Sequence, residues 1–426
     1  MRIKINGEVM IAAALYLLIF YLCLPFSMVI LNSLLIRVIV FASAALFIIG
    51  MIFLGKEKQL LAFLVLFAFI LFYWVITWSV QLDTLTYVYY GFVSLIFVFG
   101  ATTLYYSEDN DLLRRMFLFI TIIYFVTAIT SIVGLNVYPL AARELARGST
   151  YDTSLDFTTY KNIYRRMNIV SWSQAYGMLF ALPAAWMIWK KKRKVFYVVL
   201  LAAISVMLVA SQITFAVLLA IVLIAGVLIS NQSSTKTIVI TIILALAAIL
   251  ILINLDEVLG VVIELSKQVG FDFLATKLND LRVLLLYGNA VGDAGARGML
   301  YQKSFNTFLN SPLVGLVFKG KASMDQIGYH SEFFDFLGTF GFIGMMVMIT
   351  SFVAYFRFLK RTEKDSRRDL MIIFLGFMVL FVLNPVFNSP QIFVGAFLYP
   401  LLASRYCRIG ESEKRHLIPI IIKIHR

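Results

Sequence analysis

Histidine is scarce in this chain, and one of the three lies where it could do chemistry. His416 and His425 belong to a basic segment near the end of the sequence, whereas His330 stands where a long polar stretch meets an apolar one. An imidazole exchanges protons near neutral pH, so His330 is the candidate acid–base residue. Glu332 and Asp335 follow it, and either carboxylate could orient the imidazole or act as the base. A hydrogen-bonded structural histidine is the alternative interpretation.

Four arginines stand at positions where they could bind an anion. Arg297 precedes a predicted short helix, and Arg165 and Arg166 stand where a second polar stretch enters an apolar one. Arg37 lies near one end of an apolar segment. The planar guanidinium binds phosphate oxygens in bidentate fashion and stays charged, so these residues indicate phosphate binding. Arginines that only extend from a helix end to the membrane surface are common, which is the alternative.

The composition excludes two broad classes of protein. With 61% hydrophobic and 14% charged residues the chain is no soluble globular protein, since those have about 25% charged residues. The 15% aromatic content excludes a disordered chain. Two cysteines leave no room for a disulfide framework or a cysteine-rich metal site. The sequence predicts an all-α polytopic integral membrane protein, with a single transmembrane domain over 1–426.

Apolar stretches between charged breaks predict about twelve transmembrane helices, since a bilayer core needs about 20 apolar residues per span. The run 195–230 is too long for one span and is divided at Ser211-Gln212. The predicted spans are 9–25, 34–55, 59–80, 84–105, 116–137, 168–189, 195–211, 213–230, 237–255, 331–356, 370–387 and 389–404.

The distribution of charge predicts the orientation of these spans. If both termini are cytoplasmic, about two thirds of the 37 basic residues fall on the cytoplasmic side, together with nearly all of the +14 net charge. The excess charge is therefore a topology signal and indicates contact with the lipid bilayer, with no nucleic acid as partner. The two extracytoplasmic loops are then 138–167 and 256–330, and the candidate site lies on that side.

The large loop 256–330 opens with an amphipathic stretch in which apolar residues fall near one helical face. Such a helix would lie at the membrane interface and cover a site. Simple packing on the helical bundle is the alternative. The apolar residues are Val258, Leu259, Val262, Leu265, Val269, Phe273 and Leu281.

Short motifs follow one another along the extracytoplasmic side. Arg297 is followed by a Ser-Pro-Leu-Val-Gly turn at 311–315, by His330-Ser331, and by Gly-Phe-Ile-Gly at 341–344.

In the first extracytoplasmic loop, Arg166 is separated by ten residues from Gly177. Together these motifs resemble the O-antigen polymerase and ligase superfamily, in particular the Wzy-type polymerases of polysaccharide repeat units. The resemblance covers 165–180 and 295–345, and the rest of the chain agrees in span number, loop position and orientation.

The resemblance implies a GT-C-like membrane glycosyltransferase in the bacterial cytoplasmic membrane, with its active site extracytoplasmic. Such a polymerase transfers a growing glycan from polyprenyl pyrophosphate onto an incoming lipid-linked repeat unit. It would need no metal and no cofactor, because the leaving group is a lipid pyrophosphate. A polyprenyl-pyrophosphate-linked oligosaccharide is the implied substrate, and a chain-length regulator protein is a candidate partner.

The resemblance also suggests roles for the candidate residues. Arg297 and Arg166, together with Arg165, would hold the pyrophosphate and offset its charge as it leaves. His330 would orient or deprotonate the acceptor hydroxyl, or stabilise the departing phosphate, and Glu332 is the candidate alternative base.

Further residues are expected to contact the sugar. Tyr164 and Asn384, with Asp335, are the predicted substrate-contacting residues, although polar residues at helix ends are equally expected beside water. Family members carry Ser-Arg where this chain has Ser211-Gln212. Arg37 is the arginine expected to replace that side chain.

Two other functions compete with polymerisation. An O-antigen ligase shares nearly all of these motifs and differs in its acceptor, which is a lipid core oligosaccharide. A flippase for lipid-linked oligosaccharides, or another transporter, also fits many spans, but it is expected to place charges inside its spans and not in a long extracytoplasmic loop.

Overall fold

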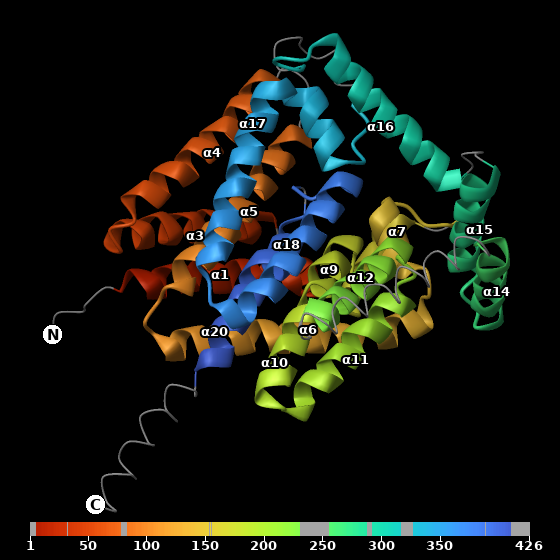
Figure 1. Ribbon diagram of the computed structural model, residues 1–426, viewed down its shortest axis with the longest axis horizontal. Helices are drawn as coiled ribbons and strands as arrows, with labels where there is room; N and C mark the ends of the chain where they lie inside the picture. The colour runs from red at the N-terminus through yellow and green to blue at the C-terminus, as the bar shows by residue number, and fades with distance from the viewer. Residues whose placement is uncertain are drawn as a thin grey trace, which may run out of the picture. The chain divides into compact units, whose positions relative to one another are not determined.

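A computed structural model describes residues 6–31, 33–77, 83–152, 154, 156–230, 255–287, 292–316, 327–387 and 389–409. Over these residues the chain is helical and contains no strand, which confirms the all-α prediction (Figure 1). The predicted span 237–255, apart from its last residue, lies outside the described residues, as do Asn388, His416 and His425. Contacts divide the chain into two compact units.

Unit 1 comprises Met1–Leu71, Val88–Ser211 and Ser389–Arg426. It holds the larger parts of α4 and α5, and the α1–α3 pair packs within it. Its helices are α1 (Gly7–Cys23), α2 (Ser27–Ile30), α3 (Ser33–Phe53), α4 (Glu57–Thr77), α5 (Asp83–Tyr105), α6 (Asn110–Val137), α7 (Ala141–Arg147), α8 (Phe157–Arg166), α9 (Trp172–Leu179), α10 (Ala181–Lys192), α11 (Val195–Ala210), α19 (Pro390–Phe393), the π-helical η2 (Val394–Leu398) and α20 (Tyr399–Arg408).

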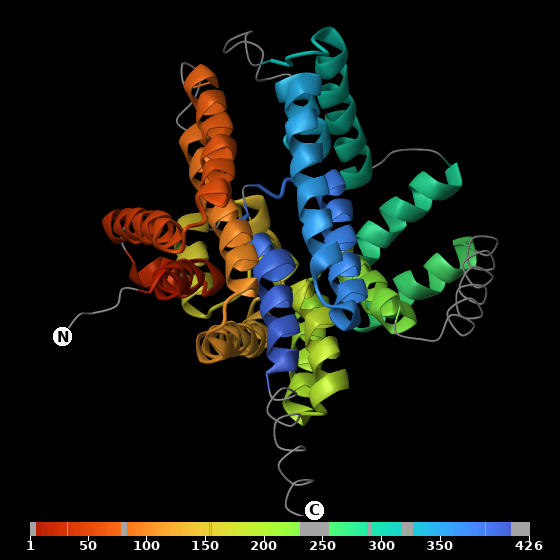
Figure 2. The same ribbon diagram turned by 60° about the vertical axis from the view of Figure 1, so that its left-hand side comes forward.

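Unit 2 comprises Phe72–Tyr87 and Gln212–Asn388. In it α17 lies alongside α18, and α14 alongside α15 (Figure 2). Its helices are α12 (Thr214–Ser230), α14 (Leu255–Gln268), α15 (Asp272–Tyr287), α16 (Gly292–Asn310), α17 (Glu332–Arg361) and α18 (Lys364–Leu383).

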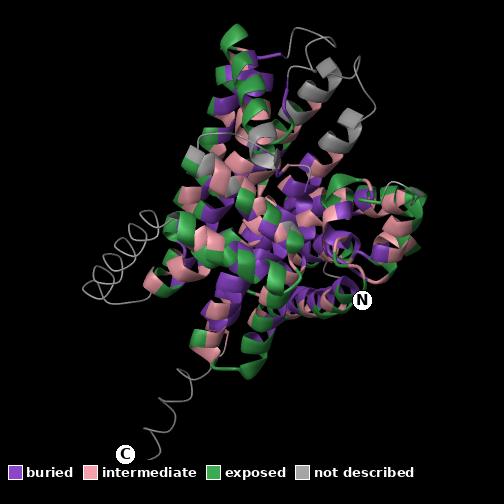
Figure 3. Cartoon of the chain, turned by 90° about the vertical axis from the view of Figure 1, so that its right-hand side faces the viewer, coloured by how far each residue is buried: buried purple, intermediate pink, exposed green. Residues whose placement is uncertain are grey.

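Long apolar helices with exposed apolar side chains indicate a membrane protein. In the part of the chain that the structure describes, three helical stretches are long and apolar enough to cross a bilayer: Leu34–Phe53, Asn110–Val137 and Glu332–Arg361. Shorter apolar helices include α1 and α11. Large apolar side chains point outward from such helices: Phe41 is 75% exposed and Val222 is 64% exposed. Buried and exposed residues alternate around the helices in Figure 3. Water would make such surfaces costly, whereas lipid accommodates them.

The helix boundaries agree with some of the predicted boundaries and correct others. The division of the run 195–230 is confirmed, since α11 ends at Ala210 and α12 begins at Thr214. The predicted span 168–189 is not one helix, because it divides into α9 and α10. The last predicted span is likewise interrupted by the π-helical turn η2.

The long helix α17 breaks at Gly341. There the backbone has φ 62° and ψ −157°, a conformation that is accessible essentially only to glycine. The turn after α16 satisfies the freed backbone groups: Phe342 N–H donates to Pro312 O at 2.7 Å, and Leu316 N–H donates to Thr339 O at 2.9 Å. The 311–315 turn and the 341–344 motif are separate in the sequence, and these hydrogen bonds connect them in the structure.

Replacing Gly341 with alanine is expected to lower the free energy of unfolding by about 1–3 kcal/mol, because the side chain would force a strained backbone. The added Cβ would also lie 2.6 Å from the carbonyl carbon of Leu313. Thermal unfolding of the purified protein in detergent measures the change. Gly260→Ala is the matched control, since that helical glycine in α14 has open space beside it and alanine there should be neutral or stabilising. Equal melting temperatures for Gly341→Ala and the unmodified protein would contradict the expectation.

The amphipathic stretch at the start of the large loop forms a helical hairpin and not one continuous helix. The chain turns at 269–271, between α14 and α15. Ile263 of α14 packs against Ala275 and Leu278 of α15, so this face is used within the hairpin. Leu265 and Val269 remain more than half exposed. Of the predicted apolar residues, Leu259 packs against this hairpin core, whereas Val262, Leu265 and Val269 are exposed.

Candidate functional site

His330 stands in the short segment before α17 and is solvent-exposed. Its Nδ1 lies 3.0 Å from the carbonyl oxygen of Gly328. A carbonyl can only accept a hydrogen bond, so in the neutral imidazole the proton belongs on Nδ1 and the lone pair on Nε2. That nitrogen is then free to accept a proton from a substrate hydroxyl.

Ser331 and Asp335 fix the beginning of α17. Ser331 is the N-cap residue, and its hydroxyl accepts from Phe334 N–H at 3.2 Å. The same hydroxyl donates to Val382 O of α18 at 2.5 Å. Asp335 Oδ2 accepts from Ser331 N–H at 3.0 Å, and its Oδ1 accepts from Ser304 of α16 at 2.6 Å. These bonds tie the start of α17 to two other helices.

Glu332 is buried, with 1% of its surface exposed. Its Oε2 accepts from Phe387 N–H at 2.9 Å, and its own N–H donates to Asn384 O at 3.2 Å. Both bonds hold the segment after α18 against the first turn of α17. This geometry favours a structural role for Glu332 over the predicted role as a base.

Arg297 lies on α16 and is half-buried. Its NH1 donates to Asn384 Oδ1 at 3.4 Å, a long hydrogen bond. Among the side chains that the structure describes, no carboxylate lies within ion-pair distance of Arg297. Asn384 is 5% exposed, and its Nδ2 has no hydrogen-bond partner within the described part of the chain. Two donors therefore lie beside each other with unused hydrogen-bonding capacity.

Tyr301 follows Arg297 by one helical turn and points the same way. Its hydroxyl donates to Leu383 O at 2.9 Å, and its ring stacks on Phe334 with centroids 5.6 Å apart. Burial raises the pKa of Tyr301, so the hydroxyl keeps its proton. Tyr301 thus fixes the face of α16 that carries Arg297 against the end of α18.

Five of the predicted residues consequently belong to one hydrogen-bonded assembly of unit 2. The sequence analysis missed Tyr301, Ser304 and Gly328, which connect them. Arg297, Tyr301 and Ser304 are spaced by four and three residues, the spacing of one helical face, and this signal could have identified the last two. The five predicted residues are Arg297, His330, Glu332, Asp335 and Asn384.

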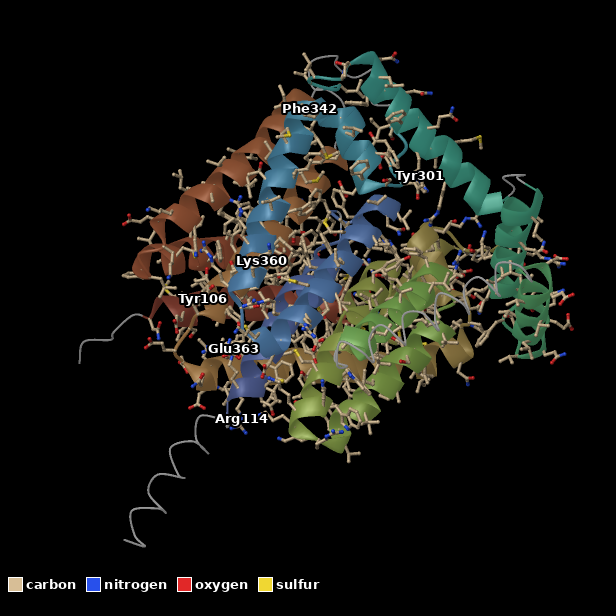
Figure 4. All side chains as sticks on the ribbon, viewed as in Figure 1. Tyr106, Arg114, Tyr301, Phe342, Lys360 and Glu363 are labelled. Atoms are coloured by element: carbon tan, nitrogen blue, oxygen red, sulfur yellow. The ribbon has the colours of Figure 1, made fainter. Side chains whose placement is uncertain are left out.

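The site lies at the end of unit 2 that is remote from its basic turn. Tyr301 lies toward the Phe342 end of α17, whereas Lys360 and Glu363 mark the opposite end (Figure 4). The helix α17 leads from the site to that turn, and it is long and apolar enough to cross a bilayer.

The other predicted residues belong to unit 1. Tyr164 on α8 is buried, and its hydroxyl donates to Glu144 Oε2 of α7 at 2.5 Å. Burial and the adjacent carboxylate raise the pKa of Tyr164. Its ring also packs against Tyr138 and Tyr160. These contacts favour a structural role over the predicted contact with sugar.

Arg165 and Arg166 end α8 and differ in their surroundings. Arg165 is partly buried near the Tyr21 and Tyr90 hydroxyls, and burial lowers the pKa of its guanidinium. Arg166 is exposed. Arg37 is exposed as well, in the second turn of α3.

Gly177, the glycine of the motif that starts at Arg166, has a packing role. A Cβ there would lie 2.4 Å from Gln391 O, so α9 and α19 approach each other closely at this point.

Within the described part of the chain, no group of three His, Cys, Asp or Glu side chains could hold a metal ion.

No protein-family model and no curated protein matches the sequence.

Proposed function

We propose that the protein is a membrane glycosyltransferase that polymerises a cell-surface polysaccharide such as O-antigen, capsule or exopolysaccharide. It would transfer a growing glycan from polyprenyl pyrophosphate onto an incoming lipid-linked repeat unit. The observation that carries this proposal is the arrangement around Arg297. Among the described residues, a half-buried guanidinium without a carboxylate lies beside the unpartnered Nδ2 of Asn384, in the same assembly as His330. A pyrophosphate would satisfy both groups at once.

The position of this assembly along unit 2 supports an extracytoplasmic reaction. The turn between α17 and α18 carries Lys360, Arg361 and Lys364, and by the positive-inside rule it faces the cytoplasm. The assembly stands at the other end of α17, a helix that is long and apolar enough to cross a bilayer. On that side a lipid-linked sugar is the available donor, and no soluble nucleotide sugar is needed.

The proposed reaction uses His330 as the base and Arg297 as the phosphate ligand. The acceptor hydroxyl attacks the anomeric carbon of the donor and gives its proton to Nε2 of His330. A carbon–oxygen bond forms to the acceptor while the bond to the phosphate oxygen breaks. The polyprenyl pyrophosphate leaves with the electron pair, and Arg297 offsets its charge, together with the amide of Asn384.

The remaining predicted residues take supporting roles. Glu332 and Asp335 hold the backbone that carries His330 and do not contact the reacting atoms. In unit 1 the proposal assigns phosphate binding to Arg165 and Arg166, and Arg37 is the further guanidinium to test. Both substrates of a polymerase carry a pyrophosphate, so more than one basic site is expected.

We further propose that the chain spans the bacterial cytoplasmic membrane about twelve times in a GT-C-like arrangement, with both termini in the cytoplasm. The exposed apolar side chains on α3 and α12 support lipid contact for these helices. A chain-length regulator protein is the proposed protein partner.

The test is incubation of the purified protein with its lipid-linked repeat unit, followed by gel analysis of the products. A ladder of lipid-linked chains is the expected result, because each transfer lengthens the glycan by one unit. Transfer to a lipid core oligosaccharide alone would indicate the ligase. Movement of the substrate across a vesicle membrane without any transfer would indicate the flippase. Protein with His330→Ala is the matched control and should give no ladder.

A further inference from the structure

Ser304 is a buried residue of α16 whose hydroxyl joins two elements of the site. Its Oγ donates to Asp335 Oδ1 at 2.6 Å and accepts from Gly328 N–H at 2.8 Å. A hydroxyl has one proton and two lone pairs, so it makes both bonds at once. The side chain is fully buried, and water therefore cannot replace either bond without a rearrangement.

The segment from Gly328 to Ser331 is held by this hydroxyl and by the carboxylate of Asp335. Besides the Gly328 bond to Ser304, the N–H groups of Tyr329 and Ser331 donate to the carboxylate. Tyr329 has φ 58°, in the left-handed region that tyrosine rarely adopts. These hydrogen bonds account for its persistence, because they fix the backbone on both sides.

Close packing brings Ser304 within reach of both partners. A Cβ on Gly328 would lie 2.3 Å from Leu300 O, one turn before Ser304. A Cβ on Gly338 would lie 2.7 Å from Ser304 O. The backbones of the 328–331 segment and of α17 thus approach α16 at distances that no larger residue allows. The contact with Ser304 depends on this approach.

The same segment also determines the tautomer of the His330 imidazole. Gly328, whose N–H binds Ser304, accepts the imidazole Nδ1–H through its own carbonyl oxygen. No hydrogen bond joins Asp335 to the ring in the described structure. Besides its direct electrostatic interaction with His330, the carboxylate therefore acts on the imidazole through Ser304 and the backbone.

We propose that Ser304 is a positioning residue for His330: its hydroxyl fixes the Gly328 peptide, and the carbonyl of Gly328 then selects the Nδ1–H tautomer and leaves the Nε2 lone pair directed to the substrate. The catalytic meaning of this arrangement rests on the proposed function, whereas the tautomer itself does not.

Nitrogen NMR of the full-length protein in nanodiscs, with ¹⁵N-labelled histidine, tests the proposal directly. The chain has three histidines, and His330→Ala assigns the signals by the loss of one pair. At a pH where the ring is neutral, we expect His330 to show a protonated Nδ1 and an unprotonated Nε2. A protonated Nε2 in the unmodified protein would overturn the proposal without any variant.

Two variants then test the coupling. Ser304→Ala is expected to convert the His330 signals to a mixture of tautomers, and Asp335→Asn to shift them in the same direction. Ser351→Ala is the matched control, because among the described residues that hydroxyl bonds only to Val347 O of its own helix and its loss should leave the His330 signals unchanged. Wild-type signals in Ser304→Ala, or the same change in Ser351→Ala, would exclude the coupling.

Activity gives the second readout. Ser304→Ala is expected to lower the turnover number roughly tenfold, the effect of one lost buried hydrogen bond, with a smaller change in KM. If the unmodified protein forms no ladder but shows the Nδ1–H tautomer, the proposed function fails and the positioning inference stands. If it forms a ladder while Ser304→Ala keeps wild-type NMR signals, the positioning inference fails alone.

Discussion

Replacing Arg297 with lysine is expected to lower the rate of glycan transfer roughly 100- to 1,000-fold, the range seen when one preorganised charge-stabilising donor is removed. The charge remains, but an ammonium presents a point charge and cannot reproduce the planar fork that binds two phosphate oxygens. Half-burial increases the effect, because water replaces the missing donors poorly. Single-turnover measurement of transfer from the lipid pyrophosphate donor gives the rate.

Arg282→Lys is the matched control for this experiment. Arg282 also lies in the large loop of unit 2, but it forms a partly exposed ion pair with Asp256 between α15 and α14. Exposed pairs contribute about 0–1 kcal/mol and tolerate lysine, so transfer should stay near the wild-type rate. If Arg297→Lys transferred glycan as fast as this control, the guanidinium would have a structural role only. The arrangement around Arg297 would then no longer support the proposed function.

Replacing His330 with alanine is expected to abolish chain extension, with a loss of roughly 100- to 10,000-fold, the usual contribution of a general base. The side chain is exposed and its one described hydrogen bond is to Gly328 O, so its removal should leave expression and membrane insertion unchanged. Gel analysis of the products, together with the amount of protein in the membrane fraction, separates the two effects.

His330→Gln refines the same prediction. An amide retains hydrogen bonding but takes up no proton, so it should be as inactive as alanine if Nε2 is the base. Substantial activity in His330→Gln would instead assign His330 to orientation of the hydroxyl. His416→Ala is a sequence-matched control and should extend chains normally, and long-chain glycan from His330→Ala would remove the imidazole from the chemistry.

Much of the helical architecture followed from the spacing of apolar and charged residues. The division near Ser211, for example, was predictable because a bilayer limits the length of a helix. The break at Gly341 and the hairpin of α14 and α15 were not, because hydrophobic periodicity continues across both. A break depends on which distant backbone can satisfy the freed groups, here the turn at 312–316.

The candidate residues also differ in how far the sequence alone could predict their roles. Arg297 and His330 stood out as candidates because charged or titratable side chains near a membrane are rare and often functional. For Glu332 the sequence and the structure favour different roles, since a carboxylate next to a histidine suggests a base while its burial against Phe387 N–H favours a structural role.

The sequence by itself determined that the chain is a helical membrane protein and which charged side chains merit attention, because composition and charge distribution respond to the solvent around each segment. Only the tertiary structure decided which hydrogen bonds these side chains form. It brought Ser304, Gly328 and Asp335 into one hydrogen-bonded set and left the buried Nδ2 of Asn384, beside Arg297, without a partner among the described residues. Such contacts join residues far apart in the chain, and no local pattern specifies which polar group will find a partner when helices pack.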